Sequence, residues 1–111
     1  KSALSEVIST DTCATPLGNG TVAFEFDINA THTMQKLGAE TIYIWEEQSN
    51  GNFEVVKTYS GGMLSTNTAA AYGRIDYRGT SGTDYYATMV LYAKDSNGSE
   101  KLYSDTYVVT A

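Results

Sequence analysis

The chain has 111 residues, with seven Lys or Arg against thirteen Asp or Glu, and a formal net charge of -6 at pH 7. That length is typical of one hydrophobic core, so we predict a single domain over residues 1–111. The acidic balance repels nucleic acids and anionic membrane surfaces, so neither is an expected partner. No run approaches the roughly 20 apolar residues of a membrane span, so we expect no membrane insertion.

The composition also bears on compartment. Thr, Ser, Asn, Gly and Tyr are abundant and Lys is scarce, as in many secreted β domains, so we expect a secreted or cell-surface protein. The one cysteine, Cys13, cannot form an internal disulfide, and stability must come from packing. We expect Cys13 to be a small buried or half-buried side chain, with a reactive or intermolecular thiol as the alternative.

Period-two patterns dominate the chain and no long amphipathic helix pattern is present, so we predict an all-β fold. EVISTDTCAT predicts a weak first strand, and PLGNG supplies the turn after it. Residues 21–29 predict a half-buried strand, because Val22, Phe24, Phe26 and Ile28 alternate with small or polar residues.

The middle of the chain is less regular. THTMQKLGA, residues 31–39, breaks the alternation, so we expect a crossover loop with room for a short helical turn. TIYIWEEQ resumes the alternation, and SNG at residues 49–51 predicts a tight hairpin into NFEVVKTYS. GGMLSTNTAA, residues 61–70, is the least regular segment and is expected to be a mobile loop.

The last third predicts three more strands. AYGRIDY forms one, RGTSGTD turns the chain, and DYYATMVLYAK and EKLYSDTYVVT form a final hairpin around DSNG. The chain therefore carries about seven antiparallel strands, with turn signals at the spacing expected for a β sandwich.

The final hairpin has a tyrosine followed by inward residues at every second position, then a turn with Gly and a Ser in the last strand: Tyr85, Ala87, Met89, Leu91, Ala93, Gly98 and Ser104. This run resembles immunoglobulin-like sandwiches of the fibronectin type III kind. The resemblance implies that fold, and implies that the Tyr85 hydroxyl bonds back to the chain before its strand.

A second pattern covers residues 18–93 in the order GNG, F-x-F, T-M-x-K-L-G-A, I-x-I, K-T-Y, N-T-A, G-T-x-G and Y-Y. It resembles a group of small secreted proteins of Gram-positive anaerobes. That resemblance implies an extracellular location and carries no activity with it.

One face of the predicted sheet is aromatic. If Tyr85 faces the core, the alternation of the strand makes Tyr86 and Tyr92 face outward. If Ile42 and Ile44 face the core on the neighbouring strand, Tyr43 and Trp45 also face outward. Trp and Tyr give a large contact area at low entropy cost, as binding surfaces require. The expected binding residues are Tyr43, Trp45, Tyr86 and Tyr92.

Three other interpretations remain open. Trp45 is a core tryptophan in one of them, with Ile42 and Ile44 exposed. In another, the aromatic residues only pair across strands, each pair stabilising the sheet by about 0.2–1 kcal/mol. In the third, the 31–39 loop covers the face with Met34 and Leu37.

Catalytic chemistry is sparse in the sequence. His32 is the only histidine and lies in the expected crossover loop, and HExxH, CxxC and phosphate-binding glycine motifs are absent. Glu46 and Glu47 are neighbours on a strand and point to opposite faces, so they cannot form the facing carboxylate pair of a glycosidase. Asp95, Asn97 and Glu100 are more typical of turn formation than of a calcium site. We predict no catalytic residue, no metal and no cofactor.

The sequence therefore favours a non-catalytic binding or adhesion module that contacts a protein or glycan through the aromatic face or the loop ends. The alternative is a structural or self-associating module, such as a spacer or assembly subunit that forms a homodimer through the same face. An enzyme is not expected.

Overall fold

The structure is a computed structural model and describes residues 6–111. It contains seven strands: β1 (Val7–Gly18), β2 (Thr21–Glu47), β3 (Phe53–Ser60), β4 (Leu64–Arg78), β5 (Asp84–Asp95), β6 (Gly98–Asp105) and β7 (Val109–Thr110). All pairings are antiparallel and join one sheet, and residues 6–111 contain no α-helix. The predicted all-β chain of about seven antiparallel strands is confirmed.

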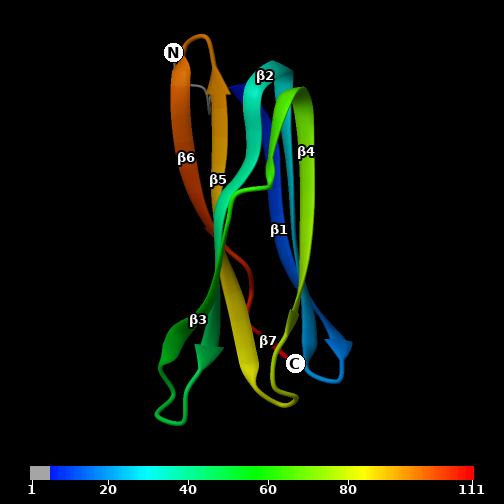
Figure 1. Cartoon of the computed structure of the whole chain (residues 1–111), viewed down its shortest axis with the longest axis vertical. Coiled ribbons are helices and arrows are strands. Elements are labelled where there is room, and N and C mark those ends of the chain that lie inside the picture. Colours follow the sequence, from blue (N-terminus) through cyan, green and yellow to red (C-terminus); the bar gives the residue numbers. More distant parts are fainter. Residues whose placement is uncertain (1–5) are drawn as a thin grey trace.

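The length of β2 determines the architecture. Its 27 residues would span roughly 90 Å if straight, at about 3.3 Å per residue, whereas the longest extent of the molecule is 46 Å. The strand must therefore fold back. The bend lies where residues 30–33 of β2 face only Ala69 of β4. Figure 1 shows β2 and β4 arching over together at one end of the molecule.

The prediction of a crossover loop at 31–39 is wrong, because β2 continues through this segment. The prediction of a mobile loop at 61–70 is also wrong from Leu64 onward, where β4 begins. Met34 and Leu37 are fully buried in the core, so neither covers the outer face. The alternation is lost here because the outer strand of a bend needs extra residues, which look aperiodic in sequence.

The bend divides the sheet into two layers. In the first layer β1 and the second half of β4 flank the first half of β2. In the second layer β5 and β3 flank the second half of β2, and β6 extends this layer beyond β5. A side-chain hydrogen bond of 2.9 Å between Thr12 Oγ1 and Ser104 Oγ joins β1 to β6 across one open side.

The core fills the space between the layers. Alternate residues of both halves of β2 and of β5 point into it, so the predicted inward faces of residues 21–29 and of β5 are confirmed. The largest fully buried side chains are Tyr85, Phe24, Phe26, Ile28, Met34, Leu37, Ile42, Ile44, Met89, Leu91 and Val22.

Tyr85 closes the core at the end opposite the bend. Its hydroxyl accepts a hydrogen bond of 2.8 Å from the Thr80 N–H, which confirms the predicted bond back to the preceding chain. The same hydroxyl donates to Glu46 Oε2 at 2.6 Å. Burial, and then this bond to Glu46, raise the pKa of Tyr85. A Cβ at Gly79 would lie 2.6 Å from the Tyr85 ring, so glycine is required there.

We expect Gly73→Ala to destabilise the fold by about 1–3 kcal/mol, the usual cost of overpacking a core. Gly73 lies opposite Phe26, and a Cβ there would lie 2.2 Å from the buried Phe26 ring. Urea unfolding measures the loss. The cost should shrink when Gly73→Ala is made together with Phe26→Leu, and an equal cost in both backgrounds would contradict this explanation.

Candidate functional site

The outer face of the second layer carries the candidate site. Ile42 and Ile44 of β2 are 1% and 0% exposed, so they face the core and turn Tyr43 and Trp45 outward. Trp45 is half-buried rather than enclosed. The interpretation of Trp45 as a core tryptophan is therefore wrong, because the two isoleucines already occupy the inward positions of this strand.

Trp45 belongs to an aromatic cluster in which Tyr86 contacts both other rings. It lies opposite Tyr86 of β5, and the two rings stack with centroids 5.6 Å apart and planes 5° from parallel. Phe53 of β3 packs edge-on against Tyr86 with centroids 5.1 Å apart. The stack is worth about 0.5–1.5 kcal/mol beyond area burial, so it stabilises the sheet whatever else this face does.

A short polar chain fixes the indole. Trp45 Nε1–H donates to Thr88 Oγ1 at 3.0 Å, and the Thr88 hydroxyl donates to Asp105 Oδ1 at 2.6 Å. Burial, and then the Asp105 carboxylate, raise the pKa of Tyr86, which stays neutral at physiological pH. The ring surface is thus held in one orientation without any charge on its aromatic members.

The four predicted residues share this face but do not form one cluster. Trp45 and Tyr86 are in contact, whereas Tyr43 lies opposite Thr88, and Tyr92 lies opposite Gly38 farther along the sheet. All four are half-buried. They form an elongated aromatic surface along β2 and β5 rather than a pocket.

The sequence reasoning missed Phe53 and Tyr103. The Phe53 position follows from a bulge, because β3 carries the extra residue Val56 between the partners of Ile44 and Trp45. Tyr103 of β6 lies opposite Val90 of β5 and is 66% exposed. The two-residue turn between β5 and β6 fixes that register, so counting outward from it would have found Tyr103.

His32 lies on the bend, between two carboxylates. Its Nδ1 is 3.6 Å from Glu6 Oε2 and its Nε2 is 3.5 Å from Asp95 Oδ2, a buried oxygen that accepts no hydrogen bond within residues 6–111. Thr31 Oγ1 lies 3.2 Å from Nδ1, but it donates its single proton to Glu6 Oε2 at 2.7 Å. The Thr31 hydroxyl therefore does not donate to His32 in this arrangement.

The β5–β6 turn is held by its own side chain. Asp95 Oδ1 accepts a hydrogen bond of 2.8 Å from the Asn97 N–H, which is the turn-forming role that the sequence favours. Among the residues that the structure describes, no group of three or more His, Cys, Asp and Glu side chains could hold a metal ion.

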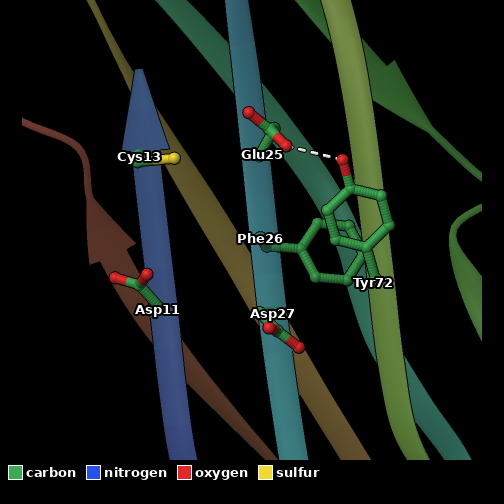
Figure 2. Close-up of a pocket in the computed structure, with 6 residues that line it drawn as sticks. All are labelled: Asp11, Cys13, Glu25, Phe26, Asp27 and Tyr72. Carbon is green, nitrogen blue, oxygen red and sulfur yellow. Dashed lines mark hydrogen bonds between the residues drawn. The ribbon is translucent and has the colours of Figure 1, made fainter. Parts of the chain in front are cut away.

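Apart from the aromatic surface, a depression of about 150 Å³ lies on the outer face of the first layer (Figure 2). Cys13 and Asp11 of β1 lie opposite Glu25 and Asp27 of β2, and the Tyr72 hydroxyl donates to Glu25. The depression is acidic and small. It is lined by Asp11, Cys13, Glu25, Phe26, Asp27 and Tyr72.

Cys13 is exposed, so the expectation of a buried or half-buried side chain is wrong. Within residues 6–111, the edge strand β1 pairs only with β2, and Cys13 points away from the core. Partial burial raises the pKa of the Cys13 thiol, and the carboxylates of Glu25 and Asp11 raise it further. The thiol therefore carries less of the reactive thiolate than its exposure suggests.

No protein-family model matches the sequence, and no curated protein matches it. One similar solved structure is described as the X-ray structure of Northeast Structural Genomics Consortium target SoR45. The two chains are 14% identical with a TM-score of 0.47, over 93% of this chain and 81% of that chain. This level of likeness identifies no family. Within the described part of the chain, no helix is long and apolar enough to cross a bilayer.

We expect Cys13 to react with Ellman's reagent at pH 8 more slowly in the folded protein than in the urea-unfolded chain, by at least about twofold, because its pKa is raised. Glu25→Gln removes one of the carboxylates that raise the pKa of the Cys13 thiol, so it should accelerate the reaction. Glu54→Gln, on β3, is the control and should leave the rate unchanged. Faster labelling of the folded protein than of the unfolded chain would contradict the effect.

Proposed function

We propose that this chain is a non-catalytic binding module that contacts a protein or glycan through the outer face of its second layer. The observation that carries the proposal is the Trp45–Tyr86 stack with Phe53 against its edge, held in place by the bond from Trp45 Nε1 to Thr88. Pre-oriented aromatic rings lose little conformational entropy on binding, which is why Trp and Tyr dominate the energetics of many interfaces.

The chemistry elsewhere supports a module without catalysis. The Thr31 hydroxyl, the His32 imidazole and the Asp95 carboxylate lie side by side in that order. The Thr31 hydroxyl, however, donates its proton to Glu6. The Cys13 thiol lies beside carboxylates that oppose its ionisation. A catalytic nucleophile instead needs neighbouring groups that favour its ionisation, such as a cation or a general base.

We further propose that the fold is a variant of the immunoglobulin-like sandwich of the fibronectin type III kind, and that the protein is secreted or displayed on a cell surface. The Tyr85 hydroxyl bond to Thr80 and the two-layered core support the first proposal. The passage of β2 and β4 from one layer into the other distinguishes this chain from sandwiches whose strands stay in one sheet. The composition supports the second proposal.

The test is an array of purified polysaccharides and extracellular proteins such as collagen and mucin, probed with the folded chain. Trp45 is the only tryptophan, so bound probes should also shift its fluorescence. We expect Trp45→Ala to weaken binding at least about tenfold, as for a central aromatic residue. The free energy of unfolding should fall by less than the ~3–5 kcal/mol typical of a fully buried Trp, because Trp45 is half-buried.

Tyr72→Ala is the matched control, since Tyr72 is 61% exposed and lies on β4 in the first layer, away from the aromatic cluster. It should leave binding intact. Binding that survives Trp45→Ala, or that Tyr72→Ala abolishes equally, would show that the aromatic face is not the site.

A further inference from the structure

The aromatic face has opposite charges at its two ends. Lys36 of β2 lies directly opposite Lys94 of β5, and both are exposed on the outer face at the end near the bend. At the other end the pairing of β2 with β5 finishes at Glu46 and Tyr85. The next residue of each strand beyond that end is acidic, Glu47 on β2 and Asp84 on β5.

The lysine pair costs the isolated molecule free energy, because like charges directly opposite across two strands repel. Within residues 6–111, Lys36, Lys94 and Glu47 form no ion pair. The two ends cannot neutralise one another inside one molecule. They are roughly 36 Å apart along β2, at about 3.3 Å per residue, and charges are screened beyond about 10 Å at 0.1 M salt.

We propose that this face binds a second copy of the chain, face to face, with the strands of the two copies antiparallel. The inference rests on the proposed function, and it identifies the partner. A two-fold axis lying in the interface and crossing the strands at right angles places the Lys36 and Lys94 end of each copy over the Glu47 and Asp84 end of the other. One symmetric arrangement thus satisfies both like-charge pairs.

The aromatic residues occupy the space between the charged ends. The axis passes between the Thr41–Val90 row and the Tyr43–Thr88 row, which lie on either side of the midpoint of the face. The Trp45–Tyr86 row of one copy then lies over the row that contains Tyr92 of the other. An aromatic centre with a charged rim is the usual anatomy of a protein interface. The net charge of -6 on each copy opposes association, so the dimer is weak and salt-dependent.

The experiment is sedimentation velocity over a range of concentrations, with two charge variants. The acidic-end variant carries Glu47→Lys and Asp84→Asn, and the basic-end variant carries Lys36→Glu and Lys94→Gln. Asn at position 84 keeps an acceptor for the Thr110 hydroxyl, which donates to Asp84 in this structure. Circular dichroism verifies that both variants are folded.

The wild-type chain should pass from monomer to dimer as its concentration rises. Each variant alone should associate at least about tenfold more weakly, because like-charged ends then meet. An equimolar mixture of the two variants should form a heterodimer at least about tenfold tighter than either variant alone, because both pairs of ends become opposite in sign.

A matched control changes net charge equally on the other layer: Asp27→Lys with Asp11→Asn alters the total charge as much as the acidic-end variant does. It should not weaken the dimer. A wild-type chain that remains monomeric overturns the proposal, as does a mixture of variants that associates no better than its components. Species larger than a dimer would also overturn it, because they require two different surfaces.

The outcomes separate this inference from the function on which it rests. A monomeric chain that binds an array probe through Trp45 overturns the second-copy partner and leaves the binding module standing. A monomeric chain that binds no probe overturns both. A dimer that Trp45→Ala leaves intact, but that the charge variants disrupt, would place the contact outside the aromatic centre and overturn the face-to-face arrangement.

Discussion

The architecture depends on one steric constraint, which is that β2 is about twice as long as the molecule. A strand of that length has to bend, and its partner β4 bends with it. The two halves of β2 then face each other, and each half has its own neighbours: β1 and the end of β4 in one layer, β5 and β3 in the other. One strand thereby forms the centre of both layers, and the core lies between its own two halves.

The candidate site follows from that bend because a sheet with one buried face must present the other. Core packing requires Ile42, Ile44 and Tyr85 to point inward, and the pleat then exposes the residues between them. The aromatic side chains of β2 and β5 meet because the register places Trp45 opposite Tyr86. Stability and candidate function are thus two consequences of one alternation, which explains why the same residues stabilise the sheet and offer a contact surface.

The outer faces of the two layers differ in character. The first layer presents carboxylates around Cys13 that suppress thiol ionisation. The second presents stacked rings, with a pair of lysines at one end and a pair of carboxylates at the other. The second face combines apolar area with charges of opposite sign at its two ends, and such a surface can be complementary to a copy of itself. An acidic chain can therefore associate through this face despite its overall repulsion.

The resemblance to fibronectin type III sandwiches implied the bond of the Tyr85 hydroxyl. The sequence by itself determined the alternating strands, the inward side chains of residues 21–29 and β5, and the outward position of Tyr86 and Tyr92. These follow from local periodicity, which is a property of neighbours along the chain. Tertiary structure alone decided that residues 34–39 and Leu64 onward are strand, that Cys13 is exposed, and that Phe53 joins the cluster. Bends, bulges and edges depend on how many residues face one another across two strands, and no local pattern encodes that number.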